Sequence, residues 1–330
     1  MKYLKILLAF FLIAGIFITI NLKPQKVTRT AFLLDTYITV TAYGKNAENA
    51  VDKAIDKVAE IDSLLSCFNP ESEIFRLNEN SYLKVSPETF DLISRAVELS
   101  KKTDGAFDIT VKPIMDLWGF GSENQSTPEE DKLKERLALV DYKNIILDKK
   151  ENSVSFKNKG MKIDLGGIAK GYAADCAAKV LKENGAENAY LDFGGNVVTI
   201  GKMPKDFLGI EKARSFVIGV QDPLKERGEI FEKVTAKGEK CAVVTSGGYE
   251  RYFEENGEKY HHIINPKTGK QPENEILSVT VVSDSSETAD ALSTAFFVSG
   301  EEFAKTKKEL FKEVIFYKTS GEIIKITGEK

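Results

Sequence analysis

The spacing of apolar positions predicts a body that mixes helices and strands. From Ala50 to Leu65 the apolar residues recur at intervals of three and four, which is the pattern of one face of an amphipathic helix. Ser86 followed by Pro87, and Thr127 followed by Pro128, are typical of the N-cap and first residue of two further helices. The same reasoning predicts a helix from Ala169 to Lys182 and a helix pair over 287–311.

Short runs rich in β-branched and aromatic residues predict the strands. The expected strands are Thr36–Tyr43, Ile145–Leu147, Val154–Phe156, Met161–Leu165, Tyr190–Phe193, Phe216–Val220, Cys241–Thr245, Val279–Val282, Val314–Tyr317 and Glu322–Ile326. Strands and helices do not alternate regularly, which favours the α+β class. Because no internal repeat or Pro/Gly-rich linker divides the body, residues 27–330 are expected to form one domain.

The first 26 residues have the layout of an export signal or a short signal anchor. Lys2 and Lys5 precede a predominantly apolar run from Ile6 to Leu22, and Lys23 follows it. The run is long enough to span a bilayer, and it contains no evident A-x-A cleavage site. We therefore expect an uncleaved anchor, with a cleaved signal as the alternative, and a body outside the cytoplasmic membrane.

Composition narrows the classes of partner. Hydrophobic residues make up 42% and charged residues 29% of the 330 residues, as in soluble globular proteins. The formal net charge of −4 gives no basic footprint for nucleic acid, so no nucleic-acid partner is expected. The three cysteines show no C-x-x-C or zinc spacing, and Cys176 and Cys241 are expected to be small core residues.

The stretch from Ile163 to Asp175 is the first candidate site. An expected strand, the adjacent Gly166 and Gly167, and the start of a helix together offer free N–H groups that suit a phosphate. Lys170 in the first helical turn gains nothing from the helix dipole, which favours a role in ligand binding. The stretch lacks the P-loop and G-x-G-x-x-G patterns, and a tight structural turn is the alternative.

Two further stretches carry candidate groups. The loop with Asp108 and Trp118, the single tryptophan, offers either a wall for a planar ligand or a packed, glycine-bent loop. The only two histidines, His261 and His262, are adjacent, and neighbours in a strand point to opposite faces. One of them can therefore act as a base or ligand contact, but the two together do not make a metal site. Ser246 lacks the G-x-S-x-G context of a hydrolase nucleophile.

Asp290 and Thr294 are candidate metal ligands. In a helix from Glu287 to Val298 they are four residues apart and share a face. A carboxylate and a hydroxyl are hard oxygen ligands, which suit Mg²⁺ shared with phosphates and water. The alternative places Asp290 on a solvated face of a helix capped by Asp284 or Ser285.

The order of the motifs resembles that of the FAD:protein FMN transferase (ApbE-like) family over about Thr36 to Gly300. The motifs are G-A-F-D-I-T-V (105–111), W-G-F-G (118–121), D-L-G-G-I-A-K-G-Y-A-A-D (164–175), G-G-N (194–196), T-S-G-G-Y-E-R-Y (245–252), H-H-I-I-N-P-K-T-G (261–269) and A-D-A-L-S-T-A (289–295). The resemblance implies an α+β flavin transferase fold related to the tunnelling fold, in a protein that is exported or membrane-anchored.

The resemblance also implies an activity. Such enzymes split the pyrophosphate of FAD, pass FMN to a threonine hydroxyl of a partner protein as a phosphoester, and release AMP with the help of Mg²⁺. The expected partners are FAD, an exported acceptor flavoprotein and the membrane. Two alternatives keep the same flavin site: an FAD pyrophosphatase that gives FMN and AMP, and a non-catalytic flavin-binding module.

Residue by residue, the resemblance implies Gly167 (through its carbonyl), Asp290 and Thr294 as metal ligands. His262 matches the histidine thought to help deprotonate the acceptor threonine, so His262 and Asp290 are the expected catalytic residues. The expected FAD contacts are Leu34, Phe68, Ala106, Phe107, Asp108, Asp164, Lys170, Ala173 and Ile263. Two positions depart from the family pattern: Asp35 stands in place of a glycine, and Asn265 in place of an aspartate.

Overall fold

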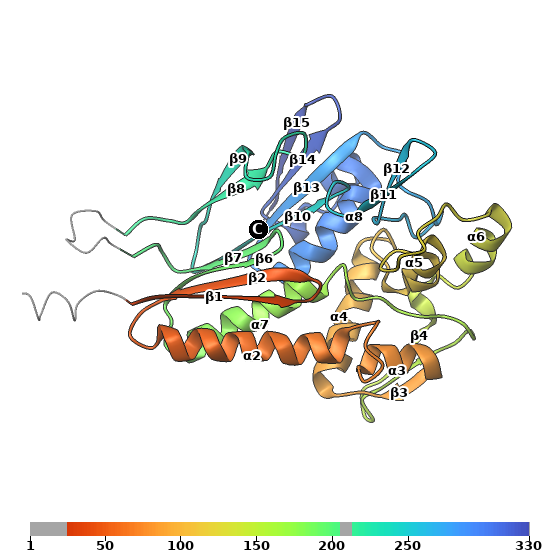
Figure 1. Cartoon of the computed structure of the whole chain (residues 1–330), viewed down its shortest axis with the longest axis horizontal. Helices are drawn as coiled ribbons and strands as arrows, with labels where there is room; N and C mark the ends of the chain where they lie inside the picture. The colour runs from red at the N-terminus through yellow and green to blue at the C-terminus, as the bar shows by residue number, and fades with distance from the viewer. Residues whose placement is uncertain (1–24, 205–212, 330) are drawn as a thin grey trace, which may run out of the picture.

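An eight-stranded antiparallel sheet forms the centre of the molecule (Figure 1). The computed structural model describes residues 25–204 and 213–329. In spatial order the strands are β1 (Lys26–Leu33), β2 (Thr36–Tyr43), β6 (Asn188–Phe193), β7 (Asn196–Ile200), β10 (Lys240–Gly247), β13 (Ile276–Ser283), β14 (Glu313–Lys318) and β15 (Ile323–Thr327). Every neighbouring pair is antiparallel, so adjacent strands can be joined by tight turns such as Leu34–Asp35 between β1 and β2.

Three long helices cover one face of this sheet. They are α2 (Ala47–Leu65), α7 (Ala169–Glu183) and α8 (Ser286–Lys305). Helix α2 packs on β1 and β2, α7 on β6 and β7, and α8 on β10 and β13. The strand residues that face the helices, such as Ile38, Val40 and Val244, are fully buried. A two-stranded ribbon, β8 (Val217–Gln221) and β9 (Ile230–Thr235), packs its apolar residues on the other face of the sheet.

A second group of elements lies beside the ends of α7 and α8 (Figure 1). Its helices are α3 (Glu73–Asn80), α4 (Pro87–Lys102), α5 (Lys112–Trp118) and α6 (Glu130–Leu137), with the short 3₁₀ turns Ile109–Val111 and Tyr142–Asn144. Its strands are β3 (Tyr82–Lys84), β4 (Ile145–Asp148) and β5 (Ser153–Phe156), and a hairpin of β11 (Tyr252–Glu255) and β12 (Glu258–His261) lies nearby. The Trp118 indole donates to the Gly269 carbonyl (2.9 Å), which fastens α5 to the loop after β12.

The strongest local signals predicted their elements closely. Strand β2 has the expected bounds, α2 ends at Leu65 as its apolar spacing indicated, and α4 starts at Pro87 behind an N-cap serine. The mixed α and β architecture is confirmed. The relation of this fold to the tunnelling fold stays a prediction. The N-terminal anchor also stays a prediction, because residues 1–24 lie outside the described part of the chain. Within the described residues, no helix is both long enough and apolar enough to cross a membrane.

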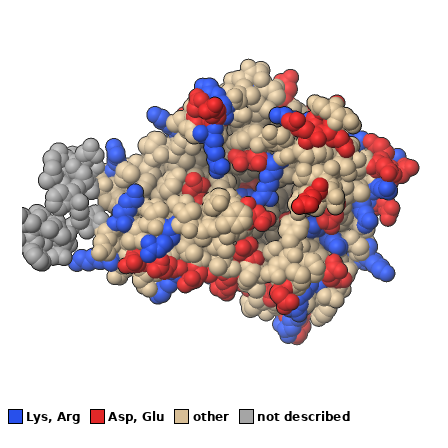
Figure 2. All heavy atoms as spheres, in the orientation of Figure 1, with Lys and Arg blue, Asp and Glu red and all other residues tan. Residues whose placement is uncertain are grey.

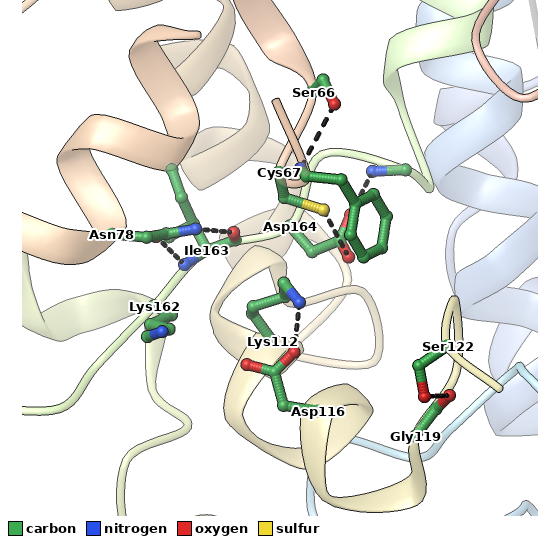
Figure 3. A network of polar contacts seen from close by, with 12 residues as sticks. Ser66, Cys67, Asn78, Lys112, Asp116, Gly119, Ser122, Lys162, Ile163 and Asp164 are labelled. Carbon is green, nitrogen blue, oxygen red and sulfur yellow. Dashed lines mark hydrogen bonds and ion pairs between the residues drawn. The ribbon is translucent and has the colours of Figure 1, made fainter. Parts of the chain in front are cut away.

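Met161–Leu165 is not a strand, so that prediction was wrong, although Met161, Ile163 and Leu165 are buried. Its backbone is held by a side chain: the Asn78 amide accepts from the Ile163 N–H (2.7 Å) and donates to the Ile163 carbonyl (2.9 Å) (Figure 3). The Asp164 N–H donates to the Ile109 carbonyl. A buried backbone needs partners, and here an amide 85 residues away replaces a neighbouring strand.

The N-cap predicted at Thr127 was also wrong. Helix α6 begins at Glu130 behind Glu129, and the Thr127 N–H instead donates to the Glu255 carboxylate (3.0 Å) of β11. The helix pair expected over 287–311 is α8, which breaks at Gly300 (φ 81°) and is followed by a 3₁₀ turn at Lys308–Leu310. Strands β1 and β7 were not predicted, because one is an exposed edge and the other is a five-residue run directly after a turn.

Candidate active site

The glycine turn is shaped by the aspartate that precedes it. The Asp164 carboxylate accepts from the Gly166 N–H (2.7 Å), and the Leu165 carbonyl accepts from the N–H groups of Ile168 and Ala169. The chain therefore turns sharply and starts α7 at Ala169. Gly166 is exposed and Gly167 is half-buried, so the turn presents its backbone at the surface. The N–H groups of Gly166, Ile168 and Ala169 already have partners within the turn, and phosphate binding by the turn stays a prediction.

Helix α7 crosses α8 directly after this turn, and a glycine makes the crossing possible. A Cβ on Gly171 would lie 2.3 Å from the Ser286 carbonyl oxygen and 2.8 Å from Asp290 Cβ, both on α8. The Gly171 N–H donates to Asp290 Oδ2 (2.9 Å). Asp290, which the sequence placed either in a metal site or on a solvated face, is only 3% exposed, so the solvated alternative was wrong.

The three predicted metal ligands come together at this crossing. A Cβ on Gly167 would lie 3.7 Å from Thr294 Oγ1, and Thr294 is one turn along α8 from Asp290. The Ser246 hydroxyl of β10 bonds to Ser293 (2.7 Å) and lies 3.4 Å from Thr294 Oγ1. Ser246 thus has hydroxyl partners here rather than the imidazole that an activated serine needs.

The chemistry of this cluster fits a hard cation. Among the described residues, no ion pair compensates the buried Asp290 carboxylate, and no group of three or more His, Cys, Asp or Glu side chains converges anywhere. Buried charges in proteins are paired or coordinate metals. One carboxylate with a hydroxyl and a carbonyl is the sparse oxygen set with which Mg²⁺ keeps room for waters and phosphates.

A residue that the sequence reasoning missed holds α8 in place. Asp175 of α7 accepts hydrogen bonds at the start of α8 from the N–H groups of Ser286 (3.0 Å) and Glu287 (3.1 Å) and from the Ser285 hydroxyl. Lys240 pairs with it from β10 (2.6 Å). Carboxylates are stabilising at helix N-termini. The last residue of the D-L-G-G-I-A-K-G-Y-A-A-D motif therefore fixes the helix that carries Asp290 and Thr294.

His262 is held in one tautomer at the edge of the site. Its Nδ1 lies 3.1 Å from the Arg251 carbonyl oxygen, which can only accept, so Nδ1 carries the proton and Nε2 is the acceptor. Burial lowers the pKa of His262 to about 4, and the charges of Lys170 and Arg251 act in the same direction. At neutral pH the ring is therefore uncharged, with a free basic nitrogen.

His261 packs away from the site, as the sequence predicted for one of the two histidines, although β12 ends at His261 and His262 follows in a bend, so strand alternation is not the reason. Its ring packs edge-on against Phe297 (5.3 Å between centroids, 90° between planes), and its Nδ1 accepts from the Ile263 N–H (3.2 Å). Burial lowers the pKa of His261 to about 4 as well. The two histidines therefore have different tasks, one in packing and one at the site.

Phe68 presents an exposed aromatic ring in the loop between α2 and α3. The residue is 52% exposed, and its ring packs against Gly121, where an added Cβ would lie 2.5 Å from the ring. The Lys112 ammonium lies 5.0 Å from the ring centroid and pairs with Asp116 (Figure 3). A planar ligand can therefore stack on the free face of Phe68. Lys112 was not singled out from the sequence, although only 6% of it is exposed.

The remaining predicted FAD contacts differ in exposure, and two of them, Asp164 and Asp108, already have hydrogen-bond partners within the protein. The Cys67 thiol donates to Asp164 (3.6 Å), and burial raises the pKa of Cys67, so the thiol stays protonated (Figure 3). The Asp108 carboxylate is used inside the protein, where it accepts from Thr110 and from the Tyr142 N–H (3.0 Å). Asp108, Ala106, Phe107 and Ile263 are buried and Ala173 is fully buried, whereas Leu34 is partly exposed. Their roles in FAD binding stay predictions.

The surface is hollowed between the sheet and the helical group, with basic and acidic side chains around the hollow (Figure 2). A separate cavity of about 680 Å³ lies between α6, the 265–274 loop and the end of α8. None of the predicted site residues lines that cavity. The clustered groups around Gly167, Asp290 and His262, rather than this cavity, therefore mark the candidate active site.

A family model and individual relatives of known name point to the same family. A family model described as the ApbE family matches residues 34–315. A Klebsiella pneumoniae protein named FAD:protein FMN transferase is 33% identical over 276 residues, covering 83% of this chain and 82% of that protein. A Treponema pallidum protein of the same name is 31% identical over 293 residues, covering 85% and 80%.

Solved structures agree with the sequence matches. The crystal structure of the ApbE protein of Thermotoga maritima superposes with a TM-score of 0.83 at 34% identity, covering 92% of this chain and 97% of that one. The flavin transferase ApbE of Vibrio cholerae gives a TM-score of 0.76 at 26% identity, covering 93% and 98%.

Proposed function

The chain belongs to the ApbE family of FAD:protein FMN transferases, and from that membership we propose that it moves FMN from FAD to a threonine hydroxyl of an exported protein, with Mg²⁺, releasing AMP. The observation that carries the proposal is the pairing of two features. One is the buried Asp290 carboxylate beside Thr294 and Gly167, which has no ion-pair partner among the residues that the structure describes. The other is the neutral His262, whose Nε2 is free to accept a proton.

The metal would be held by the Asp290 carboxylate, the Thr294 hydroxyl and the Gly167 carbonyl. When bound, Mg²⁺ would neutralise charge on the diphosphate oxygens of FAD, as metal ions do in phosphoryl transfer. Lys170, in the first turn of α7, adds a positive charge that is close enough to His262 to lower its pKa. The exposed backbone of the glycine turn and the N-terminus of α7 favour the diphosphate there.

His262 would act on the acceptor. The threonine oxygen attacks the phosphorus of the FMN half, and the bond from that phosphorus to the bridging oxygen breaks. AMP leaves with the bridging oxygen, and the threonine proton passes to His262 Nε2. The hydrogen bond from Nδ1 to the Arg251 carbonyl keeps Nε2 unprotonated before the reaction and stabilises the imidazolium that forms.

We place the reaction outside the cytoplasmic membrane, because the first 26 residues have the layout of an export signal or anchor. The acceptor is then itself an exported protein.

The Asp35 side chain, which replaces the family's glycine, lies on the exposed turn between β1 and β2.

His262→Ala should slow transfer from bound FAD about 10²- to 10⁴-fold, the usual contribution of a positioned base, with little change in FAD affinity. Because the neutral form is active and the pKa of His262 is lowered to about 4, kcat/KM should hold down to about pH 5 and fall toward pH 4. The negative diphosphate of bound FAD raises the pKa of a neighbouring histidine, so the acid limb of kcat should lie at higher pH. Both are measured from initial rates between pH 4 and 8.

His261→Gln is the matched control, because His261 has a similarly lowered pKa but packs on Phe297. It should keep the wild-type pH profile. If His262→Ala instead greatly weakens the affinity for FAD and leaves the turnover of bound FAD at saturation unchanged, His262 is a binding residue and not the base.

A further inference from the structure

An exposed aromatic pair lies at the tip of the first hairpin. Tyr37 and Phe32 are the two most exposed large hydrophobic side chains in the described part of the chain, at 71% and 62%. They face each other across β1 and β2, and their rings meet edge to face with centroids 5.3 Å apart. Two threonine pairs continue the row behind them, Thr30 with Thr39 and Thr28 with Thr41.

This pair belongs to the face of the hairpin that turns away from the core. Ile38 and Val40, which alternate with Tyr37 along β2, are fully buried against the helices. Tyr37 therefore points to the opposite face, where it gains nothing from the core. Two adjacent aromatic rings left in water are more typical of a binding surface than of scattered surface residues.

The hairpin tip is joined to the catalytic histidine by two hydrogen-bonded steps. Arg251 donates from its guanidinium to the Asp35 carbonyl of the turn (3.1 Å). The carbonyl of the same Arg251 accepts from both the N–H and Nδ1 of His262. The turn has only two residues, Leu34 and Asp35, so the aromatic pair keeps a fixed position relative to that contact. The pair therefore lies two residues from a turn that is tied, through Arg251, to His262, where the acceptor threonine must arrive.

We propose that the Phe32–Tyr37 pair is the docking surface for the acceptor protein and contacts the polypeptide that flanks its threonine. The inference rests on the proposed function, because a transferase that modifies a protein must bind that protein at the rim of its site. FAD is the wrong occupant, because small ligands are bound in concave sites that bury most of their surface, and these two residues are 62% and 71% exposed. Aromatic side chains are enriched among the residues that dominate protein–protein affinity.

The test uses the full-length chain carrying Phe32→Ser and Tyr37→Ser together, with a purified apo flavoprotein that bears an acceptor threonine. The KM for this protein should rise at least about tenfold, since loss of an aromatic anchor costs over 1.4 kcal/mol at such surfaces. The affinity for FAD and the rate at saturating acceptor should stay within about twofold of wild type.

Leu224→Ser is the matched control, because Leu224 is almost as exposed (60%) but lies in the β8–β9 connection. It should leave the KM for the acceptor unchanged. If the wild-type enzyme modifies the acceptor and the double variant has an unchanged KM for it, the docking inference is wrong and the proposed function is unaffected. No modification by the wild-type enzyme overturns the proposed function instead. If the double variant only converts a dimer to a monomer in light scattering, the pair binds a second copy of this chain and the inference is wrong.

Discussion

Asp290→Asn is expected to reduce FMN transfer by about a thousandfold or more while leaving the fold intact. The amide is nearly isosteric, and its oxygen can still accept from the Gly171 N–H, so the α7–α8 contact is kept. It has no charge, however, and a metal ion's stabilisation of the transition state is worth several kcal/mol, at 1.36 kcal/mol for each tenfold in rate. The measurement is the transfer rate at saturating FAD as Mg²⁺ is titrated, with circular dichroism as the check on folding.

Asp284→Asn provides the comparison for this variant. Asp284 is an exposed carboxylate just before α8 that pairs with Lys312, so it shares the neighbourhood of the helix but not the site. Its loss should change the rate by less than about twofold, because surface ion pairs contribute little. Transfer by Asp290→Asn at close to the wild-type rate would remove Asp290 from the site.

Gly171→Ala is expected to cost about 1–3 kcal/mol in the free energy of unfolding, as overpacking does in well-packed interiors. The added Cβ would lie 2.3 Å from the Ser286 carbonyl oxygen, which belongs to backbone and cannot rotate away. Helices α7 and α8 must then separate, and Gly167 moves away from Asp290 and Thr294. A misplacement of about 1 Å can cost about a hundredfold in rate.

Urea denaturation and the transfer rate measure the two effects of Gly171→Ala separately. The structure predicts that both fall together and that added Mg²⁺ recovers part of the activity, because a weakened site fills at higher metal concentration. A variant with wild-type stability and wild-type rate would show that the close crossing of α7 and α8 does not build the site.

Local signals allowed much of the fold to be predicted, and contacts between distant residues account for what was missed. The N-cap pair Ser86–Pro87 and the apolar spacing of α2 act within one helix, so the sequence shows them directly. The backbone of Met161–Leu165 depends on the Asn78 side chain, which no strand pattern reveals. Thr127 resembled an N-cap, but its N–H is used by Glu255 of a different hairpin.

For the candidate site, too, the sequence predicted the features set within one helix but not the contacts between distant residues. Asp290 and Thr294 are four residues apart, so the sequence placed them on one helix face, but the pattern alone could not choose between a metal site and a solvated face. The proximity of Thr294 to Gly167 in the glycine turn was expected only from the family resemblance. Asp175 was missed as a positioning residue because it binds backbone N–H groups of another helix, and Arg251 was missed because it holds His262 through its own backbone carbonyl, which every residue type has.

The central claim is tested most directly by the intact mass of an exported apo flavoprotein after incubation with the full-length enzyme and FAD, with Mg²⁺ or with a chelator. The account predicts a gain of one FMN that requires Mg²⁺ and is lost when the acceptor threonine is replaced, with AMP released in equal amount. Release of FMN and AMP with no change in the protein's mass would contradict transfer and identify an FAD pyrophosphatase. FAD that stays whole under all conditions would contradict catalysis at the Asp290 site altogether.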